Sequence, residues 1–203
     1  MTLTNILILL GAYLIGALPS AYLVGRRHGV YLRELGDGNL GTRNTYHVLG
    51  LRPALCVGAL DIGKGALATW LATWLCDDPV IPYGAALSAA IGHDFSIYIR
   101  FAGGKGMATV LGSVLVLQPV EALLGLALVG LALLVLQQWD LAWSLGMASM
   151  LGWSLYLGRP GWQSLGLVVL FASIGVKKLV DRPHARRIRA AAGPAQADSE
   201  LCG

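Results

Sequence analysis

Two glycine-rich segments have the residue types and the spacing that bind phosphate. The first covers residues 36–44 and has three glycines among its first six residues. Glycine lets a backbone fold tightly and turn its N–H groups toward an anion, as in phosphate-binding nests. Its residues of interest are Gly36, Asp37, Gly38, Asn39, Gly41, Arg43 and Asn44. A flexible surface loop would have the same spacing, so both interpretations stay open.

The second segment, Gly103-Gly104-Lys105-Gly106, opens directly into an apolar stretch that begins at Met107. The unpaired N–H groups at the start of a helix favour an anion, and Lys105 adds a full positive charge. The segment is not a nucleotide-binding P-loop, because the required earlier glycine is missing and Gly106 stands where Ser or Thr would bind magnesium. The alternative interpretation is a short turn that carries a cytoplasmic lysine.

Ionisable residues also interrupt the apolar stretches. Asp61 and Lys64 are three residues apart and therefore share a helix face, where they can neutralise each other. His93, followed by Asp94, lies ten residues before Gly103 and could reach the same pocket to move a proton. A helix–helix hydrogen bond would explain this histidine equally well. The three cysteines match no metal or disulfide spacing, and we expect neither a metal nor a cofactor.

The composition indicates that these residues sit in a membrane protein. Of the 203 residues, 56% are hydrophobic and only 13% are charged, and the mean hydropathy is +0.65. Soluble domains carry about 25% charged residues, so a soluble enzyme is excluded. In a membrane protein, the positions of the basic residues behind the net charge of +4 indicate which loops are cytoplasmic, because cytoplasmic loops are enriched in Lys and Arg. A nucleic-acid partner is not expected.

Hydropathy and charge predict an all-α bundle of seven membrane crossings with the N-terminus outside. Five arginines fall between the first two apolar stretches, which predicts that this loop is cytoplasmic. The turn at residues 77–79 holds no basic residue and is expected outside. The predicted spans are residues 4–24, 53–76, 80–99, 107–117, 119–136, 141–157 and 162–176.

The number of crossings rests on the C-terminal charges. Six of the fifteen basic residues follow residue 176, so the C-terminus is expected in the cytoplasm and the number of crossings is odd. We therefore break the long apolar stretch at Pro119, which readily starts a new helix. The fourth helix, residues 107–117, is then about 16 Å long and begins inside the protein. Residues 1–189 form the membrane domain, and residues 190–203 are expected to be a disordered tail.

Several of these segments, in order and correctly spaced, resemble the bacterial acyl-phosphate:glycerol-3-phosphate acyltransferases of the PlsY type. The likeness runs from about residue 11 to residue 119. Residues 36–44 are similar to the family's Gly-Ser-Gly-Asn-x-Gly-Ala-Thr-Asn loop, and residues 60–65 to its second-span Asp and Lys. Residues 92–96 and 103–109, ending in Thr109, match the most specific stretch almost residue for residue.

The resemblance implies a membrane enzyme of phospholipid synthesis in the bacterial cytoplasmic membrane. Its substrates would be acyl-phosphate and glycerol 3-phosphate, amid membrane lipid, and both glycine loops would face the cytoplasm. On this basis the catalytic candidates are Lys105, His93, Asp37 and Arg43. The substrate-binding candidates are Gly36, Gly38, Asn39, Gly41, Asn44, Gly103, Gly104, Gly106 and Thr109.

The chain departs from the family pattern at polar positions and keeps the glycines. Asp37 replaces a serine, and His47 replaces an arginine. The C-terminal Arg-His-x-x-Asn-Ile stretch corresponds to residues 181–188, which contain His184 but not the asparagine. Two alternative functions remain on these residues, a divergent relative that binds lipid phosphate without catalysis and a small anion transporter.

Overall fold

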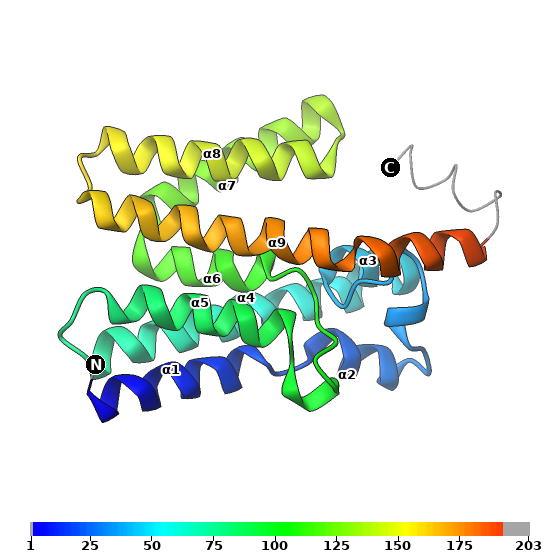
Figure 1. Ribbon diagram of the computed structural model, residues 1–203. Coiled ribbons are helices and arrows are strands. Elements are labelled where there is room, and N and C mark those ends of the chain that lie inside the picture. The colour runs from blue at the N-terminus through cyan, green and yellow to red at the C-terminus, as the bar shows by residue number, and fades with distance from the viewer. Residues whose placement is uncertain (1, 193–203) are drawn as a thin grey trace.

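The computed structural model describes residues 2–192, which form helices and connecting loops without a β-strand (Figure 1). The helices are α1 (Leu3–Gly16), α2 (Ser20–Arg27), η1 (Leu32–Glu34), α3 (Thr42–Leu49), α4 (Leu51–Leu75), α5 (Ile81–Asp94), η2 (Ile97–Ile99), α6 (Met107–Leu117), α7 (Pro119–Leu136), α8 (Trp139–Tyr156) and α9 (Gly161–Ala192). Of the predicted disordered tail, residues 190–192 end α9 and the remainder lies outside the described residues.

Four helical segments are long and apolar enough to cross a membrane by length and composition. They are Leu3–Arg27, Leu51–Leu75, Pro119–Leu136 and Gly161–Ile188. Figure 1 shows the long helices running side by side, with α6 as a shorter helix in the middle of the bundle. The boundaries expected at Pro119 and for residues 107–117 are confirmed, because α6 ends at Leu117 and α7 begins at Pro119.

One predicted span contains a break, and two others have the wrong extent. Residues 4–24 are not one helix, because α1 ends at Gly16 and α2 starts after Pro19, which lacks an N–H group and restricts the residue before it. Residues 80–99 are also interrupted, since α5 ends at Asp94 and the chain turns through η2. The last helix, in contrast, continues well past residue 176 to Ala192.

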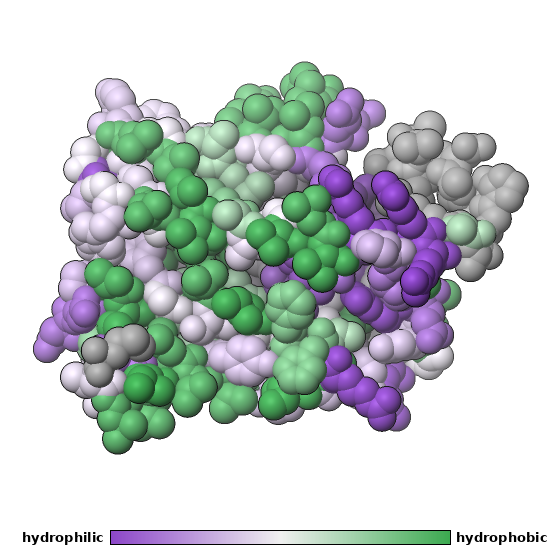
Figure 2. Space-filling view, in the orientation of Figure 1, coloured by the Kyte–Doolittle hydropathy of each residue, from purple (hydrophilic) through white to green (hydrophobic). Residues whose placement is uncertain are grey.

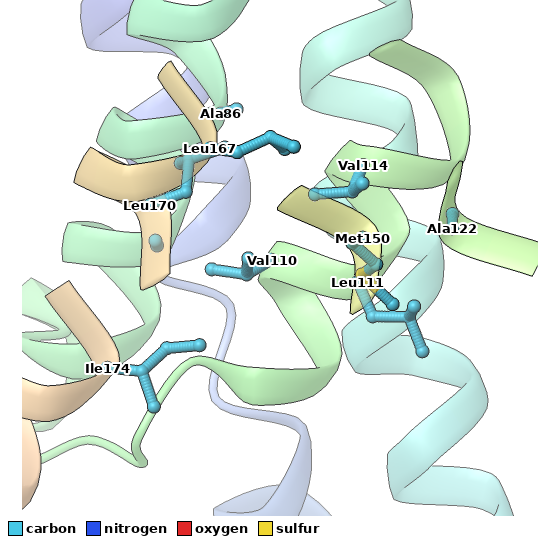
Figure 3. Packing of buried hydrophobic residues seen from close by; sticks show 10 residues of the cluster. Ala86, Val110, Leu111, Val114, Ala122, Met150, Leu167, Leu170 and Ile174 are labelled. Atoms are coloured by element: carbon cyan, nitrogen blue, oxygen red, sulfur yellow. The ribbon is translucent and has the colours of Figure 1, made fainter. Parts of the chain in front are cut away.

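A core of apolar side chains joins the second half of the bundle. Val110, Leu111 and Val114 of α6 lie among side chains of α5, α7, α8 and α9 (Figure 3). Two of their neighbours, Leu167 and Leu170 of α9, are almost fully buried. Because lipid is as apolar as these side chains, what they gain between the helices is van der Waals packing rather than removal from water. The short helix α6 is thereby fixed at the centre of the molecule.

Glycines let α6 approach α4 closely. A Cβ atom added at Gly65 would lie 2.0 Å from the carbonyl oxygen of Thr109, and one at Gly112 would lie 2.0 Å from that of Ile62. Small residues at such crossings allow membrane helices to pack backbone against backbone. The close crossing sets the start of α6, and the glycine loop before it, beside the middle of α4.

Hydrophilic residues gather at one end of the bundle. Figure 2 shows them over the end of α9 and the neighbouring loops, while apolar residues cover much of the side surface. Many large apolar side chains on the long helices are exposed, among them Leu134 of α7 at 81% and Leu7 of α1 at 59%. Exposed apolar sides with one polar end are the distribution expected of a protein embedded in lipid.

Candidate active site

The two glycine-rich segments meet at the polar end of the bundle. The Lys105 Nζ atom lies 3.5 Å from the Oδ2 atom of Asp37. Arg33 joins the segments a second time, because its Nη1 atom donates to the carbonyl oxygen of Gly103 at 3.1 Å and reaches that of Gly38 at 3.4 Å. Two segments that are 60 residues apart in sequence therefore form one surface.

Asn44 shapes the first loop from inside. Its side chain is fully buried, and its Oδ1 atom accepts a hydrogen bond from the backbone N–H of Asp37 at 2.9 Å. Its Nδ2 atom lies 2.9–3.0 Å from the carbonyl oxygens of Leu32, Leu35 and Asn39. With both ends of the amide bonded to the backbone, Asn44 holds the loop in shape and leaves ligand contacts to its neighbours.

Two glycines of the first loop adopt a conformation that other residues rarely take. Gly36 has φ +60° and Gly38 has φ +68°. A Cβ atom at Gly36 would also lie 2.2 Å from the Oδ1 atom of Asn44, whereas one at Gly41 would lie 2.9 Å from the Nδ2 atom of Asn39. The glycine pattern is thus required by the folded loop as well as by its chemistry.

The second loop presses against the end of α5. A Cβ atom at Gly103 would lie 2.0 Å from the carbonyl oxygen of His93, and one at Gly104 would lie 2.2 Å from the Nε2 atom of the same histidine. Gly106 has φ +70° and packs against the carboxylate of Asp94. The absence of side chains at these glycines lets the His93 ring lie directly behind the loop.

An inner cavity of about 160 Å³ lies behind the two loops. It includes the start of α6, at Gly106 and Met107, where no described side chain caps the helix. Its deeper wall is apolar and includes Leu111 and the rings of Trp139 and Trp143. The cavity therefore combines a helix N-terminus, which favours an anion, with a wall that suits hydrocarbon.

An outer cavity of about 260 Å³ lies between the loops and the end of α9. Five basic and three acidic side chains line it. The basic residues are Arg43, Lys105, Lys178, Arg182 and Arg186, and the acidic residues are Asp37, Asp140 and Asp181. Asn39, Arg43 and Lys105 line the outer and the inner cavity alike, so the two cavities adjoin.

The charges of the outer cavity are only partly paired. Lys178 lies 2.8 Å from Asp140, while Arg33 and Lys177 both contact Asp181. Within residues 2–192, three of the lining arginines form no ion pair. They are Arg43, Arg182 and Arg186. Guanidinium groups without carboxylate partners suit a planar or tetrahedral oxyanion.

Asp140 stays ionised in this surrounding. Burial by itself would raise the pKa of Asp140, but a hydrogen bond from Lys178 and its charge outweigh that effect and hold the pKa below its ordinary value. The charges of Arg43 and Lys105 act in the same direction. The lowered pKa of Asp140 is consistent with a positive electrostatic potential from the basic side chains that line the outer cavity.

Several buried polar atoms on the inner cavity have no partner within the described part of the chain. They belong to residues of the first glycine loop, α4 and α8, and are Asn39 Oδ1, Thr42 Oγ1, Asp61 Oδ2 and Trp143 Nε1. An unsatisfied buried polar atom costs roughly 1–3 kcal/mol. Water or the hydroxyl groups of a ligand can supply the partners of these atoms.

A buried polar cluster lies at the floor of the inner cavity. The Oδ1 atom of Asp61 accepts a hydrogen bond from the hydroxyl of Ser20 and lies 2.9 Å from Lys64 Nζ. The same oxygen lies 3.5 Å from the Nδ1 atom of His93, and Lys64 also donates to the carbonyl oxygen of Leu18 at 2.8 Å. The pair expected from the sequence exists, and it extends to His93.

Five of the candidate substrate-binding residues line neither cavity, namely Gly36, Asn44, Gly103, Gly104 and Thr109. Thr109 is fully buried on α6, packs by its carbonyl oxygen against Gly65 and is not among the residues that line either cavity. Its hydroxyl has no partner among residues 2–192. The helix rotates this side chain toward α4, because it lies two residues beyond Met107, on another face of the helix.

The fold adds site residues from distant segments that their spacing in the sequence does not connect to the glycine loops. Three arginines indicate only which loops are cytoplasmic when the sequence is taken alone. In the fold, Arg33 joins the two loops, and Arg182 and Arg186 line the outer cavity. Trp139 and Trp143 were not candidates either. Their spacing of four residues, which puts both rings on one helix face, was a signal that could have found them.

The fold and the site define a class, a helical membrane protein with an apolar-walled cavity and an adjoining basic cavity at one polar end. The model of the family described as glycerol-3-phosphate acyltransferase matches residues 6–190. A glycerol-3-phosphate acyltransferase of Thermus thermophilus is 42% identical over 157 residues, which are 76% of this chain and 78% of that protein. A glycerol-3-phosphate acyltransferase 1 of Deinococcus radiodurans is 40% identical and covers 85% of this chain and 87% of its own length.

A solved structure agrees with these relatives. The crystal structure of PlsY (YgiH), an integral membrane glycerol 3-phosphate acyltransferase in its glycerol 3-phosphate form, has a TM-score of 0.80 to this chain at 26% identity. The similarity covers 92% of both chains. The chain therefore belongs to the glycerol-3-phosphate acyltransferase family. The resemblance found in the sequence is confirmed.

Proposed function

We propose that this chain moves a fatty acyl group from acyl-phosphate to the 1-hydroxyl of glycerol 3-phosphate, as a membrane acyltransferase of phospholipid synthesis. One observation carries the proposal. Two glycine loops meet over adjoining cavities that share Asn39, Arg43 and Lys105. Both substrates carry a phosphate, and they must react side by side. Family membership supports the same function.

We assign the two phosphates to the two loops. Lys105, the backbone of residues 103–106 and the start of α6 bind one phosphate next to the apolar inner wall, where the acyl chain of acyl-phosphate can lie. The loop at residues 36–44 and Arg43 bind the phosphate of glycerol 3-phosphate in the outer cavity. Lys105 lies between the two positions and stabilises both charges.

The reaction needs no covalent acyl-enzyme, because acyl-phosphate is an activated mixed anhydride. The 1-oxygen of glycerol 3-phosphate attacks the acyl carbon, a C–O ester bond forms, and the C–O bond to phosphate breaks. The hydroxyl proton ends on the departing inorganic phosphate, so lysophosphatidate and hydrogen phosphate are the products. Positioning and charge stabilisation by the loops supply most of the catalysis.

His93 is the residue that we assign to proton movement. Its ring lines the inner cavity, its Nδ1 atom faces Asp61 at 3.5 Å, and its Nε2 side packs against Gly104. A carboxylate behind one ring nitrogen orients an imidazole, which leaves the other ring nitrogen to exchange a proton. Asp37 has a different assignment. It pairs with Lys105 and positions that ammonium group when phosphate is absent.

We further propose the arrangement in the membrane. Seven crossings, with the N-terminus outside and the C-terminus in the cytoplasm, set both loops and the basic end of α9 at the inner leaflet of the bacterial cytoplasmic membrane. There the loops reach water-soluble glycerol 3-phosphate while the inner cavity opens toward lipid. Residues 1–189 form this membrane domain. The polar end formed by the loops and α9 supports this orientation (Figure 2).

The test is transfer by the purified protein. Protein in detergent receives acyl-phosphate and labelled glycerol 3-phosphate, and lysophosphatidate is separated and counted. Labelled lysophosphatidate and an equal amount of released phosphate are expected. Phosphate-ligand binding without lysophosphatidate would instead identify a non-catalytic relative. Counterflow of glycerol 3-phosphate in sealed vesicles would identify a transporter.

A further inference from the structure

A groove separate from both cavities lies between α2 and the turn that contains η2. It holds about 660 Å³ and shares no lining residue with the inner or the outer cavity. Its characteristic side chains are Tyr22, Tyr31, Tyr98, Arg26 and Arg100. Among the described residues, no carboxylate lines it. We call it the tyrosine–arginine groove.

The aromatic and basic groups of this groove are in contact. The rings of Tyr22 and Tyr31 pack edge to face at 6.0 Å. The guanidinium of Arg26 lies 5.8 Å from the centre of the Tyr22 ring, and its Nη1 atom lies 3.3 Å from the hydroxyl oxygen of that tyrosine. Within residues 2–192 neither Arg26 nor Arg100 forms an ion pair. The groove therefore presents two uncompensated positive charges next to aromatic rings.

An unusual backbone turn forms one wall of the groove. Arg100 and Phe101 follow each other with φ 55° and 60°, a region that costs non-glycine residues roughly 1–3 kcal/mol each. The turn points Arg100 to the groove and leaves Phe101 60% exposed. Leu23 and Ile97 nearby are 57% and 51% exposed. Apolar side chains exposed in this way suit hydrocarbon rather than water.

The groove lies at the C-terminal end of the first apolar segment, where basic residues begin. The segment Leu3–Arg27 is long and apolar enough to cross a membrane, and its last turn holds Arg26 and Arg27. Tyrosine is enriched at the level of lipid head groups, and basic residues there attract anionic lipids. Guanidinium groups bind phosphate by two parallel hydrogen bonds. Together these properties favour a ligand that has a phosphate group and lies at the membrane surface.

We propose that the tyrosine–arginine groove binds the head group of an anionic phospholipid. Arg26 and Arg100 contact the lipid phosphate, and the tyrosines contact the glycerol region. The acyl chains run along the exposed apolar side chains of Leu23 and Ile97. The bound lipid holds this end of the protein at the depth that keeps the adjacent glycine loops at the membrane surface.

The proposal is tested by lipid binding, which does not depend on the transfer reaction. Detergent-purified protein is titrated with phosphatidylglycerol and with phosphatidylcholine of the same acyl chains, and bound lipid is counted by native mass spectrometry. The wild-type protein is expected to bind phosphatidylglycerol about tenfold more tightly. The double variant Arg26→Gln/Arg100→Gln should lose that preference. Arg27→Gln, a change of the same charge at an exposed neighbour outside the groove, should keep it.

Two further arms separate the possible outcomes. Arg26→Lys/Arg100→Lys keeps both charges without the paired hydrogen bonds and should keep part of the preference, which also excludes a folding defect as the cause of its loss. Millimolar inorganic phosphate should leave lipid binding unchanged. Equal binding of both lipids, an undiminished preference in the double glutamine variant, or displacement of the lipid by free phosphate would overturn the proposal.

Discussion

The end of the bundle where α7 begins and the glycine loops at the other end differ in how closely their charged side chains are paired. At the end where α7 begins, Glu121 is fully buried and pairs with Arg159 through two hydrogen bonds of 2.6 and 3.3 Å. Beside it, Gln118 donates to the hydroxyl of Tyr83 at 2.9 Å. At the loop end, Lys105 and Asp37 are 3.5 Å apart, and several arginines have no carboxylate partner among the described residues.

This difference in pairing distinguishes charges that stabilise the fold from charges that can bind a substrate. A buried carboxylate needs a well-made pair, because an unpaired buried charge costs several kcal/mol. The Glu121–Arg159 end therefore stabilises the fold. At the glycine loops, Lys105 is loosely paired and Arg43 forms no ion pair within residues 2–192, so a phosphate can bind these two cations without breaking a close internal pair. Substitutions at the two ends should consequently change different quantities.

The largest effect on turnover is expected from Lys105→Ala. Its ammonium group lies between both cavities, and loss of one charged contact to a transition state costs roughly 100-fold or more in rate. Steady-state kcat/KM for glycerol 3-phosphate should fall by about that factor with unchanged thermal unfolding. Arg52→Ala, an exposed basic residue on α4, is the control and should keep normal activity. A decrease below threefold in Lys105→Ala would contradict the assignment.

The second-largest effect is expected from Gly104→Ala, which should decrease kcat by about 10-fold to 100-fold. The added Cβ would lie 2.2 Å from the His93 ring and 2.5 Å from the carbonyl oxygen of Leu40, so the loop or the ring must move, and small displacements of reacting groups are costly. Gly130→Ala adds the same methyl group into open space on α7. Equal kcat in the two variants would show that the contact between His93 and the loop has no catalytic role.

Glu121→Gln should lower stability and leave chemistry unchanged. The variant keeps the side-chain shape but removes the buried charge that Arg159 binds, at a cost of about 1–3 kcal/mol. Tm from tryptophan fluorescence in detergent should decrease, while kcat/KM per folded molecule stays within about twofold. A decrease of kcat in Glu121→Gln without a decrease of Tm would contradict a purely stabilising role for the Glu121–Arg159 pair.

The smallest change is expected for Asp37→Ser. Serine can still accept the turn hydrogen bond from the Asn39 N–H, now made by the carboxylate at 3.0 Å, and it removes negative charge beside the phosphate site. We expect kcat/KM for glycerol 3-phosphate to rise by about threefold to fivefold, or about 1 kcal/mol. A decrease would mean that the carboxylate itself takes part in the reaction.

The sequence predicted the parts of the fold that depend on local chemistry. The break at Pro119 follows from the missing N–H of proline together with the basic C-terminal segment, which requires an odd number of crossings, and neither needs tertiary context. The end of α5 and the contact of Arg33 with Gly103 could not be predicted, because they arise from packing between distant segments. For the same reason Asn44 was identified as a candidate ligand, whereas its amide is bonded to the backbone on both sides.

The central claim is that the two substrates bind side by side, so that Lys105 of the second loop contacts the same glycerol 3-phosphate as Arg43 of the first loop. A double-mutant cycle in calorimetric binding of glycerol 3-phosphate tests it most directly, with Arg43→Ala, Lys105→Ala and the double variant. Residues that share one ligand should be non-additive, and we predict a coupling free energy of about 1 kcal/mol or more. Strict additivity of the two losses would contradict a shared site.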